Sequence, residues 1–133
     1  MDKILDLSGL ENQNVPKKRK KRKRKPGKGS KDTSPELLTQ KYLRELGIKF
    51  TTQYELSGKF YDIYIPSKNL LIEVDGDYWH GKDIDYPDKS KMQKRSFVND
   101  RTKDGLATIN GFGIVRIWES EITLEKVKEL IYT

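Results

Sequence analysis

Residues 60–80 read FYDIYIPSKNLLIEVDGDYWH, and the predicted architecture of the chain follows from them. The middle of this stretch, Pro-Ser-Lys-Asn at residues 66–69, separates two runs rich in β-branched and aromatic residues and has the length of a four-residue hairpin loop. We expect Ile65 and Leu70 to flank that loop symmetrically, which sets the register of the whole hairpin. The stretch therefore predicts two antiparallel strands whose side chains alternate between the faces of a sheet.

Three carboxylates converge in this predicted hairpin. The symmetric register places Asp62 opposite Glu73, and the two-residue period of a strand puts Asp75 on the same face as both. Carboxylates at directly paired positions repel each other unless a positive charge lies between them, since their Cβ atoms are roughly 5 Å apart. A divalent cation fits that gap, and Mg²⁺ prefers a few carboxylates together with water and phosphate oxygens. With His80 close by in the sequence, the cluster predicts a metal-dependent phosphodiesterase site.

An alternative interpretation is that these acids are merely solvated residues of an edge strand. The apolar residues of the hairpin argue against it, because they occupy both faces. One face holds Ile63, Ile65, Leu70, Ile72 and Val74, and the face with the acids holds Phe60, Tyr64 and Leu71. Strands that are apolar on both faces are usually central, and an unpaired charge is costly to bury there. The acids of a central strand therefore need a partner.

Composition restricts the classes of protein that the chain can belong to. Its 133 residues suffice for one modest domain, and they include one histidine and no cysteine. Neither a disulfide framework nor a thiolate zinc site is available, so we expect no zinc. No apolar run has the length needed to cross a bilayer, and the N-terminus lacks the core of a signal peptide. We expect a soluble cytoplasmic protein.

The net charge of +7 is concentrated in the first quarter of the chain. Residues 1–32 carry twelve Lys or Arg against four acids, whereas the other residues carry fifteen against sixteen. Nine cations stand in succession: Lys17, Lys18, Arg19, Lys20, Lys21, Arg22, Lys23, Arg24 and Lys25. Like charges oppose packing, and such a run binds polyanions by releasing counterions. We therefore predict a flexible DNA-binding tail over 1–32 and a nuclease domain over 33–133. A nuclear-localisation signal is the competing interpretation of the tail.

Local signals predict the other secondary-structure elements. Ser34 followed by Pro35 marks the start of a helix, which Gly47 ends. A strand over residues 50–56 precedes the hairpin. A second helix is expected over residues 89–109.

The second predicted helix and the elements after it complete the fold. Its apolar stripe would consist of Val98, Thr102, Leu106 and Ile109. Residues 114–118 form a short β-rich run, and Thr123 caps a last helix. The order is α-β-β-β-α-β-α, and a helical crossover places the last strand parallel to the central one. The predicted class is α/β, a mixed sheet flanked by helices.

The acids and the histidine recur in an order that resembles a known family. The order Glu…Asp…His…Asp is carried by Glu36, Asp62, His80 in Tyr78-Trp-His-Gly81, and Asp100 in Asn99-Asp-Arg-Thr102. Together with Val115-Arg-Ile-Trp-Glu119, this pattern resembles the very short patch repair endonuclease and its phage homing-endonuclease relatives. Both belong to the PD-(D/E)xK nuclease superfamily. The resemblance covers about residues 34–122 and implies a restriction-endonuclease-like fold.

The resemblance also implies catalytic roles. Asp62 would be the principal metal ligand, assisted by the backbone carbonyl of Val74. His80 would act as general base or position the water, with Glu36 and Asp100 holding or tuning it. These roles suit phosphodiester hydrolysis, which needs a metal to neutralise charge and a base for the attacking water.

One further feature matches the repair family, and two others set this chain apart from it. Tyr78 and Trp79 match the aromatic pair that wedges between base pairs in the repair enzyme. The structural zinc site of that family is built with cysteines, which this chain lacks. The repair family also lacks both acids of the Glu73-x-Asp75 pair, whereas many other superfamily members bind metal there. Glu73 and Asp75 therefore stand as additional candidate ligands beside Asp62.

The sequence predicts a magnesium-dependent endonuclease acting on double-stranded DNA, a homing-type enzyme from a phage or mobile element, with Mn²⁺ as a substitute cation. The loop from Lys82 to Arg95, together with Arg101, is a candidate for choosing the DNA sequence. One alternative is a mismatch or structure-specific repair nickase, and another is a catalytically idle binding module. A double-strand break would require either a homodimer or sequential nicks by one copy.

Overall fold

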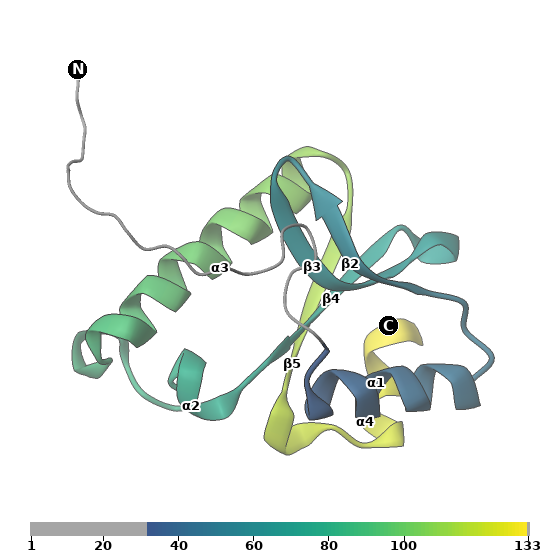
Figure 1. Cartoon of the computed structure of the whole chain (residues 1–133), viewed down its shortest axis with the longest axis horizontal. Coiled ribbons are helices and arrows are strands. Elements are labelled where there is room, and N and C mark those ends of the chain that lie inside the picture. Colours follow the sequence, from purple (N-terminus) through teal and green to yellow (C-terminus); the bar gives the residue numbers. More distant parts are fainter. Residues whose placement is uncertain (1–31, 133) are drawn as a thin grey trace. The chain divides into compact units, whose positions relative to one another are not determined.

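The computed structural model describes residues 32–132, so the run of nine cations lies outside the described part. Its centre is one mixed sheet in the strand order β2-β3-β4-β5 (Figure 1). The strands are β2 (Thr51–Leu56), β3 (Lys59–Ile65), β4 (Leu70–Asp75) and β5 (Gly113–Trp118). β2, β3 and β4 are antiparallel, and β5 pairs parallel with β4. The predicted α/β class and the predicted parallel strand are confirmed.

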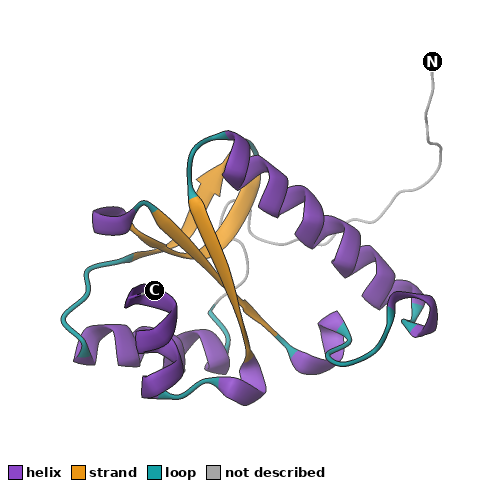
Figure 2. Cartoon of the chain, turned by 180° about the vertical axis from the view of Figure 1, so that it is seen from behind, coloured by secondary structure: helices purple, strands orange, loops and turns teal. Residues whose placement is uncertain are grey.

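Helices cover both faces of this sheet (Figure 2). They are α1 (Ser34–Glu45), α2 (Asp77–His80), α3 (Lys91–Ile109) and α4 (Leu124–Tyr132), with 3₁₀ turns at Pro66–Lys68, Tyr86–Asp88 and Glu119–Glu121. α1 and α4 contact each other on one face, whereas α3 packs on the other against β5 and α2. Within the described residues, no helix is both long and apolar enough to cross a membrane.

The hairpin has the symmetric register that its loop predicts. Ile65 pairs with Leu70, and Ile63 pairs with Ile72. The loop closes with Asn69 in the left-handed conformation at φ 48°, which asparagine tolerates better than most residues. The Asn69 side-chain amide also donates a 2.9 Å hydrogen bond to the carbonyl of Gly111, which ties the hairpin loop to the start of β5.

Two apolar layers hold the sheet between the helices. The layer toward α1 and α4 contains Leu43, Ile63, Ile65, Ile72, Ile117, Val127 and Ile131, with Leu70 and Val74 packed against it. The layer toward α3 contains Tyr61, Leu71 and Ala107. Tyr61 and Ile63 are two residues apart on β3 yet belong to different layers. The strict alternation of β3 therefore breaks at Asp62, which lies where the strand changes faces.

The first helix begins one residue earlier than its sequence signal indicates. Thr33, not Ser34, is the N-cap residue. Its hydroxyl accepts a hydrogen bond from the Glu36 backbone, and the Glu36 carboxylate accepts one from the Thr33 backbone. This capping box competes successfully with the Ser-Pro signal, because it satisfies two backbone donors at once. Asp32 precedes it and accepts a 3.0 Å hydrogen bond from Gln40.

The predicted apolar stripe of α3 is wrong. Val98 is 55% exposed and Ile109 is 84% exposed, while Gln93 and Ala107 are buried. The inner face of α3 is polar because it contacts the acids of the sheet, so hydrophobic periodicity points to the wrong side of this helix. The result leaves apolar and basic side chains on the outer face of α3.

Candidate active site

His80 lies between two carboxylates at the end of α2. Its Nδ1 is 2.7 Å from Asp100 Oδ2, and its Nε2 is 3.8 Å from Asp75 Oδ1. An ionised carboxylate only accepts hydrogen bonds, so in the neutral ring Nδ1 carries the proton and donates it to Asp100. The lone pair of Nε2 then remains available to take a proton. The predicted neighbours His80 and Asp100 are thus brought together from α2 and α3.

The surroundings of His80 raise its pKa above the ordinary value for histidine. The hydrogen bond to Asp100 is the main cause, and burial opposes it. The negative charge of Asp75 raises the pKa further, because it stabilises the protonated ring. A proton taken up at Nε2 would therefore be stabilised by a carboxylate on each side of the ring.

The start of α3 holds α2, and with it His80, in place. The Gln93 side-chain amide donates a 2.6 Å hydrogen bond to the carbonyl of Tyr78. Lys89 Nζ donates hydrogen bonds of 3.2 and 2.9 Å to the carbonyls of His80 and Gly81. Gly81 ends α2 with φ +66°, and a Cβ atom there would lie 2.9 Å from Lys89 Nζ. Only glycine combines this conformation with so close an approach.

Asp62 and Glu73 meet where the β3–β4 ladder ends. The last backbone pair of that ladder is Ile63 with Ile72, and beyond it side chains bind the free backbone groups. Asp62 Oδ2 accepts a 2.8 Å hydrogen bond from the Val74 N–H, and Glu73 Oε1 accepts one of 3.2 Å from the Asp62 N–H. Each carboxylate thus binds a backbone N–H of the opposite strand, as expected from a hairpin register that places Asp62 opposite Glu73. The Val74 N–H thus binds Asp62, and the role of the Val74 carbonyl as a metal ligand stays a prediction.

The site around Asp62 has an excess of negative charge. Burial raises the pKa of Asp62 to about 9, and the charges of Glu73 and Glu36 contribute to the shift. Burial also raises the pKa of Glu36, which comes from the first turn of α1. Lys103 on α3 forms an ion pair with Glu73 and lies 4.8 Å from the centre of the Tyr61 ring. Among the described lysines, Lys103 is therefore the one that pairs with any of the three carboxylates Glu36, Asp62 and Glu73.

Arg116 on β5 compensates the acids around His80. Its Nη1 is 3.2 Å from Asp75 Oδ1 and 3.4 Å from Asp100 Oδ1, and its Nη2 is 2.6 Å from Asp104 Oδ1. Burial alone would lower the pKa of Arg116, but the Asp104 hydrogen bond and the neighbouring charges raise it. The pKa of Asp75 is raised by burial, and Arg116 and His80 oppose that rise.

Two groups of ligand atoms are therefore available to a metal ion. Asp75, His80 and Asp100 each offer one atom within 4.8 Å of the others. Arg116 already supplies a cation to both of those carboxylates, so this group gains little from a metal. Asp62 has no such cation among the described residues, and burial together with the charges of Glu73 and Glu36 raises its pKa, a cost of ionisation that a divalent ion would relieve. The carboxylates around Asp62 fit a hard divalent cation better on these grounds.

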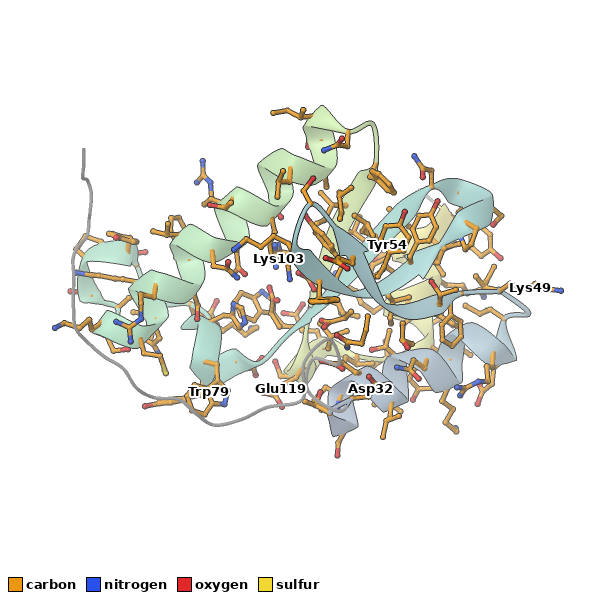
Figure 3. The ribbon with its side chains drawn as sticks, turned by 45° about the horizontal axis from the view of Figure 1, so that its top comes forward. Asp32, Lys49, Tyr54, Trp79, Lys103 and Glu119 are labelled. Atoms are coloured by element: carbon orange, nitrogen blue, oxygen red, sulfur yellow. The ribbon has the colours of Figure 1, made fainter. Side chains whose placement is uncertain are left out.

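The candidate DNA-contacting residues lie in different surroundings. Tyr78 and Trp79 are 67% and 59% exposed on α2, directly before His80, and their rings meet edge to face. Figure 3 shows Trp79 on α2 and Lys103 reaching from α3 toward the strands. Lys82 is 3.3 Å from both Asp83 and Glu121, so its charge is already shared.

The two candidate arginines lie on α3. Arg101 stacks over the ring of Phe97 at 5.6 Å, and Arg95 is exposed. Neither contacts the His80 cluster in the described structure. The run Lys17 to Lys25 lies outside the described residues.

Sequence reasoning did not assign Lys103 or Arg116 to the site. Lys103 lies one helical turn after Asp100, so helical spacing places both on one face of α3. Arg116 pairs with Glu73 across the parallel ladder. The register between β4 and β5 would have revealed Arg116 as a site residue. No local turn joins these two strands, so the sequence pattern does not set that register.

Comparisons with known proteins agree with this geometry. The family of the DNA mismatch endonuclease Vsr matches residues 13–86. The type II nicking enzyme V.HpaIIP of Haemophilus parainfluenzae is 30% identical over 81% of this chain and 82% of its own length. The type II nicking enzyme V.NmeDIP of Neisseria meningitidis serogroup C is 25% identical over 77% and 79%. The catalytic domain of the homing endonuclease I-Bth0305I superimposes with a TM-score of 0.53 and 27% identity, over 75% of this chain and 91% of that domain.

Proposed function

The chain belongs to the Vsr family of DNA mismatch endonucleases and is a DNA endonuclease, and on this basis we propose that it nicks double-stranded DNA with the help of a divalent cation, Mg²⁺ by preference. The curated relatives are named nicking enzymes, which supports the cleavage of one strand. The chain has a single histidine, so one copy offers one such base. One base serves one phosphodiester bond at a time.

Asp62 and Glu73 would hold the cation, with Glu36 beside them. The support for this assignment is that burial, with the neighbouring Glu73 and Glu36, raises the pKa of Asp62. When bound, the cation supplies charge neutralisation for the scissile phosphate and activation of a water molecule. Mg²⁺ suits a site that offers carboxylate oxygens and leaves room for phosphate oxygens. Mn²⁺ is the proposed substitute.

His80 acts as the general base in this proposal. Asp100 keeps the proton on Nδ1, so Nε2 faces the attacking water with its lone pair. As the water attacks phosphorus, its proton passes to Nε2, and the bond to the leaving 3′ oxygen or 5′ oxygen breaks. Asp75, 3.8 Å from Nε2, stabilises the imidazolium that forms. Arg116 keeps Asp75 and Asp100 in these positions by contacting both.

Tyr78 and Trp79 are proposed to contact the bases next to the scissile phosphate. Both rings are exposed on the short helix that carries His80, so a duplex at His80 would meet them first. Aromatic side chains that enter between base steps kink DNA, which exposes the backbone to attack. The run Lys17 to Lys25 is proposed to add affinity that is independent of sequence.

A homing-type role is the second candidate. It is supported by the likeness to the I-Bth0305I catalytic domain, which this chain covers over 91% of its length. In that case two copies, or two successive nicks, would produce a double-strand break. The chemistry of each strand cut would be the same, so the two candidates differ only in the DNA product.

The observation that carries the proposal is the placement of His80 between Asp100 and Asp75. The test is to incubate supercoiled plasmid with the full chain and MgCl₂, and then with chelator instead. His80→Gln keeps a polar side chain near Asp100 but cannot take up the proton, and Asp62→Asn removes the proposed ligand charge. Both variants should lose at least about 100-fold in cleavage rate, because general base catalysis contributes roughly 10²- to 10⁴-fold.

Glu125→Gln on α4 is the matched control, since it removes one exposed acid far from the proposed site and should cleave like the parent protein. Nicked circles without linear product would support the nicking enzyme, and linear product that appears as fast as nicked circles would favour the homing-type role. Equal cleavage by the parent and by His80→Gln would refute the assignment of the base.

A further inference from the structure

The outer face of α3 carries a basic groove that the proposed active site does not use. We call it the α3 groove, and the residues that define it here are Lys59, Tyr86, Lys91, Lys94, Arg95 and Val98. Four of these six are cations, and none of the described residues that line the groove is acidic. Lys59 reaches it from β3 and donates a 2.8 Å hydrogen bond to Asn99, which ties the β2–β3 hairpin to α3.

The four cations of the α3 groove are not neutralised by acids of the described residues. Among residues 32–132, no ion pair is formed by Lys59, Lys91, Lys94 or Arg95. The contact of Lys94 is aromatic, at 5.3 Å from the centre of the Tyr86 ring. Like charges packed this closely repel one another, so the arrangement favours an anionic partner.

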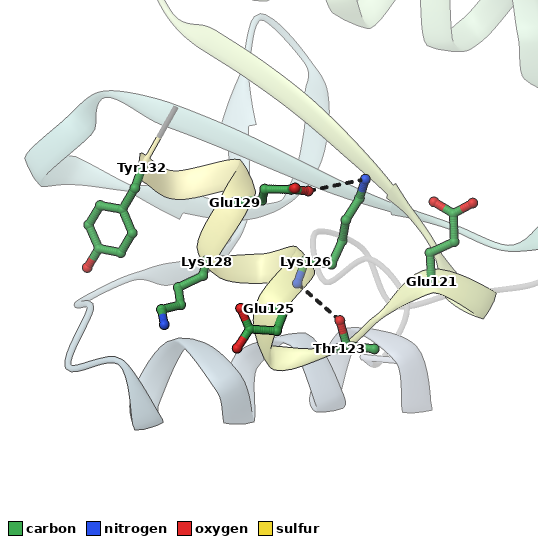
Figure 4. A pocket seen from close by; sticks show the side chains of 7 residues that line it. All are labelled: Glu121, Thr123, Glu125, Lys126, Lys128, Glu129 and Tyr132. Atoms are coloured by element: carbon green, nitrogen blue, oxygen red, sulfur yellow. Dashed lines mark hydrogen bonds and ion pairs between the residues drawn. The ribbon is translucent and has the colours of Figure 1, made fainter.

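A second groove has the opposite balance of charge. The groove along α4 is lined by Glu121, Thr123, Glu125, Lys126, Lys128, Glu129 and Tyr132 (Figure 4). Its three carboxylates outnumber its two lysines, and Lys126 lies 3.7 Å from Glu129. A polyanion would be repelled there, whereas the α3 groove offers an excess of positive charge.

We propose that the α3 groove binds the sugar–phosphate backbone of the substrate DNA on the side of α3 opposite to the catalytic residues. This proposal deepens the nicking function and rests on it, because it names how the same DNA is held. Asn99, which contacts Lys59, immediately precedes Asp100, so the groove and His80 are served by neighbouring residues of one helix. A duplex whose scissile phosphate reaches His80 can therefore extend along α3, which carries both Asn99 and Asp100.

The dimensions and surface of the α3 groove match a nucleic-acid backbone. From Lys91 to Val98 the helix rises about 10 Å, which equals the rise of about three nucleotides along one strand. Tyr86 and Val98 are 42% and 55% exposed between the cations. Their apolar surface can contact deoxyribose, while Lys91, Lys94 and Arg95 contact phosphates. An acidic protein partner would lack this regular spacing of charge.

The test uses the full chain and a short fluorescent duplex in chelator, so that binding is measured without cleavage. The groove variant combines Lys91→Gln, Lys94→Gln and Arg95→Gln. Each phosphate contact contributes about 0.9 to the slope of log affinity against log salt concentration, so the slope should fall by about 2 to 3. A matched control combines Lys49→Gln, Lys68→Gln and Lys128→Gln, which removes the same charge from other surfaces and should leave the slope nearly unchanged.

A second variant separates charge from fold. Lys91→Arg with Lys94→Arg retains the cations and should retain the slope, and thermal unfolding should show that all variants fold. Equal slopes for the groove variant and the control would overturn the proposal. Cleavage is scored separately with Mg²⁺: a parent protein that fails to nick, while the groove variant still loses its slope, would refute the nicking function and leave the α3 groove as a DNA-binding surface.

Discussion

At the scale of single residues, the site depends on how charge is divided between two neighbouring groups. Arg116 compensates the acids around His80, and Lys103 is the one described cation that pairs with the acids around Asp62. The same carboxyl group therefore has different properties at Asp75 and at Asp62, although both come from the same hairpin. This division is what separates a proton-handling group from a metal-binding group in the proposed mechanism.

Replacing Asp100 by asparagine should change the pH dependence of cleavage. The Asp100 hydrogen bond is the main cause of the raised His80 pKa, so its loss lowers that pKa. A general base works when deprotonated, so the acid limb of kcat/KM should move to lower pH. The rate at the plateau should fall by up to about 100-fold, because Nδ1 loses its anionic acceptor.

Single-turnover rates between about pH 5 and 9 would measure both effects of Asp100→Asn, since this range brackets the ordinary histidine pKa. Asp104→Asn is the control. Asp104 lies on α3, as Asp100 does, and it contacts Arg116 of β5 but not His80 in the described structure. An unchanged acid limb in Asp100→Asn would show that His80 does not govern the profile.

Replacing Asp62 by asparagine should stabilise the metal-free protein at alkaline pH. The folded-state pKa of about 9 lies above the unfolded value of about 3.9, so the protein loses stability as the pH rises between them. The asparagine side chain carries no charge to bury, and the gain should be about 1 to 3 kcal/mol at about pH 8. Near about pH 4 the difference should vanish, since Asp62 is then protonated in the folded protein.

Thermal unfolding in chelator at these two pH values would test this prediction for Asp62→Asn. Adding Mg²⁺ should raise the melting temperature of the parent protein more than that of the variant, because a ligand stabilises the state that binds it. A lower melting temperature for the variant in chelator at the alkaline pH would contradict the excess of charge at this site.

At the scale of elements, the position of His80 depends on α3 rather than on its own helix. α2 spans four residues, and a helix of that length has no stability of its own. Gln93 joins the two helices, because its amide donates to the Tyr78 carbonyl and its oxygen accepts from the Ser90 N–H. The first turn of α3 is therefore the support of the catalytic histidine.

Replacing Gln93 by leucine should weaken both the fold and the site. The leucine would leave the Tyr78 carbonyl and the Ser90 N–H without their partner, which costs about 2 to 3 kcal/mol for buried groups. Urea unfolding measures that loss. Cleavage at a temperature where the variant is fully folded should also be slower, since α2 loses a contact.

Asn110→Ala is the matched control for Gln93→Leu. Asn110 bonds the Leu106 carbonyl at the other end of α3, where both groups reach solvent. It should affect stability by no more than about 0.5 kcal/mol and leave cleavage unchanged. A Gln93→Leu protein with parental cleavage would show that α2 is held by other contacts.

At the scale of the whole molecule, the acids of the proposed active site and the cations of the α3 groove lie on opposite sides of α3. Residues 33–132 carry almost equal numbers of acids and bases, yet Asp75 at the end of β4 and Asp100 on α3 meet on the inner side of α3. Four described cations that form no ion pair within residues 32–132, namely Lys59, Lys91, Lys94 and Arg95, line the groove on the outer face of the same helix. This separation lets a polyanion approach a site that is itself acidic, because the attraction comes from the neighbouring surface.

Local rules of the sequence were enough to specify the hairpin, the order of the strands and the approach of Asp62 to Glu73. A four-residue loop and a two-residue period leave one register that buries the apolar faces. The alternation of β3 failed at Asp62, so that Tyr61 and Ile63 pack into different apolar layers. The choice of N-cap was missed by one residue because two capping signals lie next to each other.

Packing between distant segments, by contrast, set which cation serves which acid and which face of α3 is buried. Arg116 meets Asp75 and Asp100 across a parallel pairing, and Lys103 meets Glu73 from another element. No turn or periodicity links such distant segments, so their contacts depend on how the layers pack. The position of the α3 groove has the same physical cause. Polar contacts occupy the inner face of α3, so Val98 of the predicted apolar stripe lies on the outer face beside the cations of the groove.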